Sequence, residues 1–293
     1  MPASPSRFVD REDEIRELRE LTAAAGPSIA LLYGRRRVGK TYLLDRAWDE
    51  EDRFYFLASD TTPSRNRREL IHELGRWSGS PLAAEDYPTW RTVFRLLAQR
   101  ARDRPLVVVL DEFQYLMGGD DDVVSQLVAV WDREVGEADL NLVLCGSAVG
   151  TMEQLRRGGS PLYGRIDWMA RLGPFDYLDA AAMAPGLGCR DAARLFGIFG
   201  GVPSYLAAVE PGCRLDEEVV RTVLSPRGEV HLQLAHLLEQ EQGIRDPGEY
   251  RAVLAAVAVG ATETNEIAGK AGLQDRDHVV RRALETLEVL DLV

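Results

Sequence analysis

Residues 28–41 read SIALLYGRRRVGKT, an almost wholly apolar run followed at once by an arginine-rich loop between two glycines. The apolar run has no polar alternation, which is typical of a short strand buried on both faces of a sheet. The loop matches the P-loop pattern, in which Gly34 and four further residues precede Gly39-Lys40-Thr41. A helical pattern from Lys40 to about Asp49 completes the strand–loop–helix context that this motif requires. That context makes a chance glycine-rich turn a poor alternative.

The loop contains the residue types that triphosphate binding needs. Its glycines let the backbone wrap around phosphate oxygens, and the following helix directs its positive end at the same oxygens. Lys40 is expected to reach the β- and γ-phosphates as a catalytic residue, and the Thr41 hydroxyl to ligate Mg²⁺. The three arginines could equally be solvated or contact a partner, and they receive no catalytic role. The predicted nucleotide-binding residues are Gly34, Arg35, Arg36, Arg37, Val38, Gly39, Lys40, Thr41 and the adjoining Tyr42.

Two carboxylates, Asp111 and Glu112, follow the apolar run of residues 106–110. Ligands of parallel sheets bind outside the carboxyl ends of the strands, so this pair is expected beside the P-loop. Asp111 is predicted to hold Mg²⁺, mostly through water, and Glu112 to polarise the water that attacks the γ-phosphate. One alternative is a strand-end turn with two solvated acids. Another is a nucleotide switch that only binds, which needs Asp111 but not Glu112.

Ser147 follows the next largely apolar run, residues 141–146. A polar side chain at that strand end would lie between the γ-phosphate and the attacking water. The alternative is the N-cap of a helix over residues 148–155, since serine is a favoured cap. Both interpretations can hold at once.

Further apolar and amphipathic segments extend this pattern. We expect a second strand at residues 54–57 and helices over residues 11–24, 65–77 and 89–103. Strands without polar alternation, separated by helices, indicate an α/β fold with a parallel sheet covered on both faces. Residues 1–175 are therefore predicted to form the P-loop core. Two further parts are expected, a helical lid over residues 176–228 and a winged-helix-like domain over residues 229–293.

Composition restricts the class of protein. A net charge of −12 argues against wholesale attraction to nucleic acid or to an anionic membrane. No apolar stretch approaches the roughly 20 residues that a membrane span needs. The three cysteines, Cys145, Cys189 and Cys213, are far apart and form no metal-spaced pair. A cytoplasmic protein without a membrane partner fits these features best.

With these residues identified, the chain resembles the archaeal and bacterial ATPase family within the AAA+/STAND group of P-loop NTPases. The resemblance extends over nearly the whole sequence. The matching segments are FVDRE (8–12), YGRRRVGKT (33–41), LDEFQY (110–115), CGS (145–147), PLYGR (161–165) and GGVPSYL (200–206). It implies ATP and Mg²⁺ as the ligands, and it implies adenine because no guanine-reading motif is present.

Several roles follow from the resemblance alone. Phe8, Val9 and Arg11 would line the adenine and ribose side, although this segment could instead cap the first helix. Pro203 would touch the base from the lid, or could simply start a helix. Ser147 has the position of a sensor. Arg165 would be a sensor or finger arginine facing the γ-phosphate of its own or a neighbouring subunit, or else a surface charge.

The last segment resembles a winged helix-turn-helix domain, with helices expected over residues 250–259, 262–271 and 277–290. Many relatives continue further, so the domain is expected to be truncated at Val293, unless the protein is unusually short. A helix-turn-helix suggests DNA, but residues 230–293 carry eleven acidic and six basic side chains. The segment is therefore predicted to couple ATP hydrolysis to a protein partner or to self-association. The alternatives are a slow nucleotide switch and an ATP-controlled DNA-binding regulator.

Overall fold

The computed structural model describes residues 9–49, 53–118, 122–241, 244 and 246–293, and the chain divides into two compact units. The first unit comprises Arg11–Leu172. The second comprises Met1–Asp10 together with Gly173–Val293, as far as these residues are described. The predicted division after residues 175 and 228 remains a prediction about domains.

The first unit is a five-stranded parallel sheet with the strand order β2-β3-β4-β1-β5. The strands are β1 Ser28–Tyr33, β2 Arg53–Leu57, β3 Leu106–Asp111, β4 Leu140–Gly146 and β5 Trp168–Arg171. The α-helices are α1 Glu12–Ala23, α2 Lys40–Ala47, α3 Pro63–Trp77, α4 Trp90–Asp103, α5 Val123–Val130 and α6 Val149–Leu155. Short helical turns are η1 Ala84–Asp86, η2 Phe113–Leu116 and η3 Trp131–Val135.

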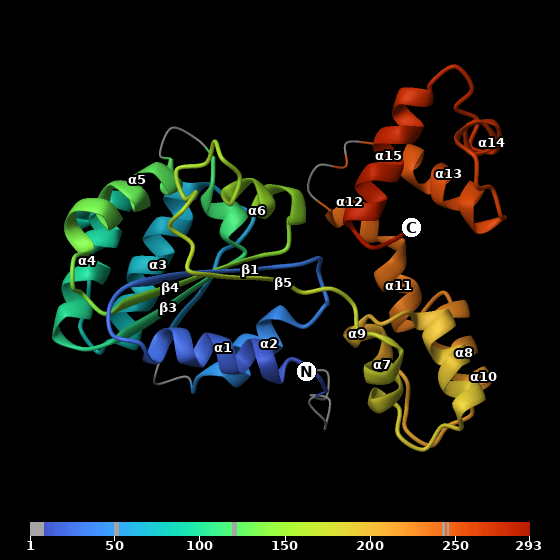
Figure 1. Cartoon of the computed structure of the whole chain (residues 1–293), viewed down its shortest axis with the longest axis horizontal. Coiled ribbons are helices and arrows are strands. Elements are labelled where there is room, and N and C mark those ends of the chain that lie inside the picture. The colour runs from blue at the N-terminus through green and yellow to red at the C-terminus, as the bar shows by residue number, and fades with distance from the viewer. Residues whose placement is uncertain (1–8, 50–52, 119–121, 242–243, 245) are drawn as a thin grey trace. The chain divides into compact units, whose positions relative to one another are not determined.

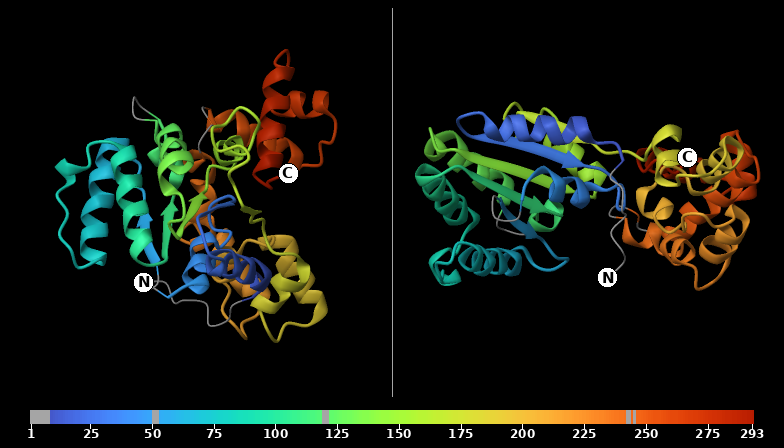
Figure 2. Two further views of the ribbon diagram at one scale, coloured as in Figure 1. Left: turned by 60° about the vertical axis from the view of Figure 1, so that its left-hand side comes forward. Right: turned by 90° about the horizontal axis from the view of Figure 1, so that it is seen from below.

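Helices cover both faces of this sheet, as the apolar strands require. The α1 and α2 helices lie on one face, and α3, α4 and α5 lie on the other (Figure 1, Figure 2). All side chains of β1, β3 and β4 are buried. The predicted α/β P-loop fold with a covered parallel sheet is thus confirmed. The edge strand β5 and the helix α5 were not predicted.

The second unit is helical in its described residues and contains two separate hydrophobic clusters. One cluster joins Val9 and Phe175 to side chains as far along the chain as Val230, and the other extends from Leu238 to Leu287. The helices are α7 Tyr177–Met183, α8 Cys189–Phe199, α9 Pro203–Leu206, α10 Leu215–Val219, η4 Val220–Leu224, α11 Glu229–Ala235, α12 Leu237–Gln240, α13 Pro247–Ala258, α14 Thr264–Lys270 and α15 Asp277–Val289. None of the helices in the described residues is both long and apolar enough to cross a bilayer.

The start of the P-loop depends on a close approach between two backbones. A Cβ added to Gly34 would lie 2.2 Å from the carbonyl oxygen of Leu172, which directly follows β5. The Leu172 amide in turn donates to the Tyr33 carbonyl at 2.7 Å. Glycine is therefore required at position 34 for packing as well as for access to phosphate.

We predict that Gly34→Ala lowers the free energy of unfolding by about 1–3 kcal/mol, because the added methyl group forces these backbones apart. Denaturant unfolding without nucleotide measures the change. Gly150→Ala is the matched control, since Gly150 lies within α6 and has no atom within 4 Å of the added Cβ. Alanine there should leave stability unchanged or raise it by about 0.5–1 kcal/mol. Equal stabilities of the two variants would contradict the prediction.

Candidate functional site

The P-loop joins the carboxyl end of β1 to the first turn of α2. The Gly34 amide donates to the Gly146 carbonyl of the neighbouring strand β4 at 3.3 Å. Arg37 and Gly39 have positive φ angles of 72° and 95°, which turn the chain sharply before α2 begins. Val38 is buried beneath the loop. This backbone shape is typical of an anion-binding nest at a helix N-terminus.

Lys40 lies within this loop and not in solvent. Its ammonium donates to the carbonyl oxygens of Gly34 at 2.7 Å and Arg35 at 3.1 Å, and its side chain is buried. A buried ammonium must be hydrogen-bonded, because burial of an unpaired charge is costly. The same donors can be redirected to phosphate oxygens that enter the loop.

The three arginines of the loop have different surroundings. Arg35 is buried, which excludes a fully solvated role for it. Arg36 donates to the Tyr115 hydroxyl at 2.9 Å, and Arg37 is half-buried. Tyr42, on the exposed side of α2, accepts a hydrogen bond from Arg46 at 3.1 Å. Their predicted contacts with nucleotide remain predictions.

Asp111 lies beside Thr41, as the two predicted metal ligands should. The Thr41 hydroxyl donates to Asp111 Oδ2 at 3.2 Å. The Tyr55 hydroxyl donates to the same oxygen at 2.5 Å, and the Glu112 amide donates to Oδ1 at 2.8 Å. Asp111 is only 2% exposed, so the alternative of a solvated strand-end acid is wrong for this residue.

Glu112 follows in the left-handed backbone region, with φ of 53°. Its Oε2 atom accepts hydrogen bonds from the Ser147 hydroxyl at 2.6 Å, from the Ser147 amide at 3.2 Å and from the Gln114 side-chain amide. Ser147 therefore hydrogen-bonds to the Glu112 carboxylate. It does not cap α6, whose N-cap is Ala148. The polar ends of β3 and β4 meet as the sequence suggests.

Two residues of this cluster, Tyr55 and Gln114, were missed at the sequence level. Gln114 is buried, and it donates to Ser147 Oγ at 3.2 Å as well as to Glu112. Its own amide oxygen is buried without a hydrogen-bond partner. A signal for Gln114 was its place two residues after the acid pair. Within the predicted strand, residues 54–57, Tyr55 differs from its neighbours only by its hydroxyl, which by itself does not indicate a site.

Cys145 lies at the end of β4 close to both Asp111 and Lys40. Burial, reinforced by the negative charge of Asp111, raises the pKa of its thiol well above the usual value. The side chain is thus an uncharged part of the wall of the site.

The predicted nucleotide contacts outside the loop and the strand ends lie as follows. Phe8 is outside the described residues. Val9 belongs to the core of the second unit, and Pro203 is the first residue of α9, as helix-start prolines are. Arg11 is the N-cap of α1 with φ of 75°, and its guanidinium contacts Glu14 at 3.4 Å. Their roles towards the base and ribose remain predictions.

Arg165 is bound to groups of its own unit. Its guanidinium pairs with both Asp132 oxygens at 2.8 and 2.7 Å, and it donates to the Pro161 carbonyl at 2.8 Å. A hydrogen bond from Arg165 lowers the pKa of Asp132. To face a γ-phosphate, Arg165 would have to exchange this ion pair for the phosphate, and its predicted sensor or finger role is not tested by this geometry.

Comparison with known proteins gives this loop and acid pair a family context. A family model described as "ATPase domain predominantly from Archaea" matches residues 8–209. The chain belongs to this family of ATPase domains. It is 25% identical over 273 residues to an uncharacterized protein from Methanocaldococcus jannaschii. The aligned region covers 92% of this chain and 58% of that protein. A second uncharacterized protein from the same organism is 38% identical over 56 residues, 19% of this chain and 54% of its own length. The ATPase-family chain thus spans little more than half the length of the curated relatives it matches.

Solved structures share the fold. The Walker-type ATPase of Pyrococcus abyssi superposes with a TM-score of 0.71 at 22% identity, over 97% of this chain and 90% of that one. The Aeropyrum pernix ORC2 protein, solved in ADPNP–ADP complexes, superposes with a TM-score of 0.63 at 16% identity. The superposition covers 99% of this chain and 88% of the ORC2 chain. At these identities the likeness establishes the fold alone. It confirms that this ATPase-family chain has the P-loop α/β architecture with a helical C-terminal region.

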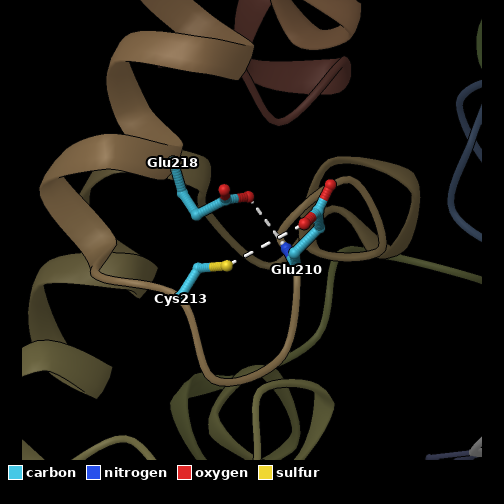
Figure 3. Close-up of side chains that lie close together, drawn as sticks. All are labelled: Glu210, Cys213 and Glu218. Atoms are coloured by element: carbon cyan, nitrogen blue, oxygen red, sulfur yellow. Dashed lines mark hydrogen bonds between the residues drawn. The ribbon is translucent and has the colours of Figure 1, made fainter.

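One group of side chains in the second unit of this ATPase-family protein has atoms spaced for a metal ion, namely Glu210, Cys213 and Glu218 (Figure 3). Glu218 already accepts hydrogen bonds from the Glu210 amide at 2.8 Å and from the guanidinium of Arg221 at 2.5 Å. The arginine hydrogen bond lowers the pKa of Glu218. Since Arg221 supplies the positive charge beside Glu218, this ion pair accounts for the arrangement of the group without a metal ion.

We predict that Glu218→Gln lowers the free energy of unfolding by about 1–2 kcal/mol at neutral pH, because it removes a charge-assisted hydrogen bond from Arg221. The folded-state pKa of Glu218 is depressed, so its contribution is full above the unfolded pKa of about 4.3 and is lost as the pH falls through the folded value. Denaturant unfolding should show that the free energies of unfolding of the wild type and Glu218→Gln differ at neutral pH and become equal at acidic pH. A difference that stays constant with pH would contradict the prediction.

Proposed function

We propose that this protein binds Mg-ATP at residues 34–41 and hydrolyses its terminal phosphoanhydride bond. The observation that carries this proposal is the contact between Thr41 Oγ1 and Asp111 Oδ2 at 3.2 Å. It joins the P-loop to the acid pair at the carboxyl edge of the sheet, where nucleotides bind in such folds. Family membership supports the same reaction.

The phosphates would bind in the backbone of the loop. The turns at Arg37 and Gly39 direct amide groups towards the loop interior, and α2 adds its positive end. Lys40 would exchange its bonds with the Gly34 and Arg35 carbonyls for bonds with the β- and γ-phosphates. Val38, Tyr42 and the three loop arginines are further proposed contacts.

Magnesium fits the oxygen ligands that adjoin the loop. A hydroxyl from Thr41 and a carboxylate from Asp111 are hard oxygen donors of the kind Mg²⁺ prefers. When bound, Mg²⁺ would neutralise charge on the β- and γ-phosphate oxygens. Thr41 would ligate it directly, and Asp111 would hold it through water.

Glu112 would act as the general base for a water molecule. The donors from Ser147 and Gln114 all reach one oxygen, Oε2, and fix the carboxylate in one orientation. Glu112 would orient the water and take a proton from it as the water oxygen bonds to the γ-phosphorus and the bond to the ADP oxygen breaks. Ser147, as the proposed sensor, would link the γ-phosphate to Glu112. Arg165 is proposed to add positive charge there.

The second unit is proposed to couple the nucleotide state to a protein partner or to self-association. In this scheme Phe8, Val9 and Arg11 contact the adenosine part, and Pro203 contacts the base from the helical lid, as in the resembling family. Residues 229–293 would act as the winged-helix-like output module. The cytoplasmic location remains a prediction.

DNA is the less favoured partner because several basic side chains of the output module form ion pairs with acids of the same module. Arg276 contacts Glu249 at 2.5 Å, and Arg282 contacts the same carboxylate at 3.7 Å. Lys270 contacts Glu266 at 2.8 Å. DNA affinity depends on cations that pair with phosphates, and these cations are already paired within the module. A slow nucleotide switch differs from the proposed ATPase only in its rate of turnover.

We expect Lys40→Ala to weaken ATP binding by about tenfold to a hundredfold, the usual effect of losing hydrogen bonds to a charged group. Calorimetric titration with a non-hydrolysable ATP analogue in the presence of Mg²⁺ measures the affinity. The chain contains only two lysines, so Lys270→Ala is the matched control and should bind as the wild type does. Unchanged affinity in Lys40→Ala would overturn the placement of the triphosphate.

We expect Glu112→Gln to slow phosphate release by about a hundredfold to ten-thousandfold while ATP affinity changes little, because the amide keeps the shape but cannot accept the proton. Single-turnover release of phosphate from bound ATP is the measurement. Glu85→Gln, at an exposed acid of η1, serves as the control and should keep wild-type turnover. Undiminished release in Glu112→Gln would sink the hydrolytic assignment, and negligible release by the wild type would favour the slow switch.

A further inference from the structure

The Tyr55 side chain links a strand outside the loop and acid motifs to the proposed metal ligand. Tyr55 lies on the edge strand β2, paired in register with Val109 of β3, and Asp111 lies two residues further along β3. From that position its hydroxyl reaches Asp111 Oδ2 at 2.5 Å. Three elements therefore meet at one carboxylate, because Thr41 of α2 donates to the same oxygen and Asp111 itself ends β3.

The Tyr55 hydroxyl can only act as the donor in this contact. A phenolic hydroxyl is protonated at neutral pH and is therefore a donor, and a carboxylate oxygen accepts. A hydrogen bond to a charged group is stronger and more directional than one between neutral groups.

The ring of Tyr55 also has a cation–π contact with Arg53. The guanidinium of Arg53 lies 5.3 Å from the Tyr55 ring centroid and is itself buried. It also donates to the Leu44 carbonyl and, at 2.5 Å, to Asp45 Oδ1, both on α2. Consequently α2 is connected to Tyr55 twice, through Arg53 at one end and through Thr41 and Asp111 at the other.

We propose that Tyr55 is a positioning residue that sets the Mg²⁺ affinity of the nucleotide site by fixing the orientation of the Asp111 carboxylate. This inference rests on the proposed function, since it concerns the metal that accompanies ATP. Tyr55 does not itself touch the metal or the nucleotide in this scheme. Its effect is exerted through Asp111.

Loss of the Tyr55 hydroxyl should lower the affinity for Mg²⁺ and leave the binding of the phosphates in the loop unchanged. Without Tyr55, Asp111 loses the shorter of the two described hydrogen bonds to Oδ2, so its carboxylate is held less firmly in the direction in which it would receive a metal-bound water. The phosphate cradle consists of the loop backbone and Lys40, which have no contact with the Tyr55 hydroxyl among the described hydrogen bonds. Mg²⁺-dependent and Mg²⁺-independent nucleotide binding should therefore separate.

The test is calorimetric titration of ADP and of a non-hydrolysable ATP analogue into the full chain, in excess EDTA and at graded Mg²⁺ concentrations. For Tyr55→Phe we expect affinity in EDTA to stay within about twofold of wild type. The Mg²⁺ concentration for half-maximal tightening should rise by about tenfold, as loss of one hydrogen bond to a charged group predicts. Tyr55→Met, which also removes the ring, should show at least the same rise in that concentration.

Tyr250→Phe is the control because it deletes the hydroxyl of a buried tyrosine that contacts Thr286 at 3.5 Å in the second unit. It should leave both titrations at wild-type values. Equal weakening of Tyr55→Phe with and without Mg²⁺ would mean a general structural role and would overturn the inference, as would an unchanged Mg²⁺ requirement. If the wild type itself gains no affinity from Mg²⁺, the proposed function fails first.

Discussion

The burial of the Asp111 carboxylate is the constraint on which the rest of the site depends. A charge that is 2% exposed is stable only when hydrogen-bond donors surround it, because desolvation of an isolated carboxylate costs several kcal/mol. The donors come from the P-loop helix, from the edge strand and from the next backbone amide. Satisfying this one group therefore fixes α2, β2 and β3 relative to one another.

The same requirement connects the two acids to different neighbours. Asp111 is bound by Thr41 and Tyr55, whereas Glu112 is bound by Ser147 and Gln114. The side chains of these adjacent residues thus have different side-chain partners, although the Glu112 amide also donates to the Asp111 carboxylate. In the proposed mechanism, these different partners would allow metal binding and proton transfer to be altered independently. The buried, unpartnered amide oxygen of Gln114 lies in the second group, and such groups are uncommon in native proteins and often mark functional sites.

Several arginines of the second unit form ion pairs with glutamates of the same unit. Arg221 binds Glu218, Arg251 binds Glu239, and Arg276 binds Glu249. With a chain charge of −12, this internal pairing engages part of the positive charge of an already acidic protein. These charges are the reason why the proposed function favours a protein partner over a polyanion.

The sequence by itself determined the loop, the acid pair and the covered parallel sheet. These features are local: the P-loop depends on glycines and Lys40 at fixed spacing, and β1, β3 and β4 are largely apolar runs. The edge strand β5, Trp168–Arg171, was missed because its residues alternate between half-buried and exposed, without an apolar run. Only the tertiary structure decided that Ser147 binds Glu112 instead of capping α6, and that Tyr55 and Gln114 belong to the site. Those contacts join residues 35, 56 and 2 positions apart, and strand register and side-chain direction, which no local pattern encodes, bring them together.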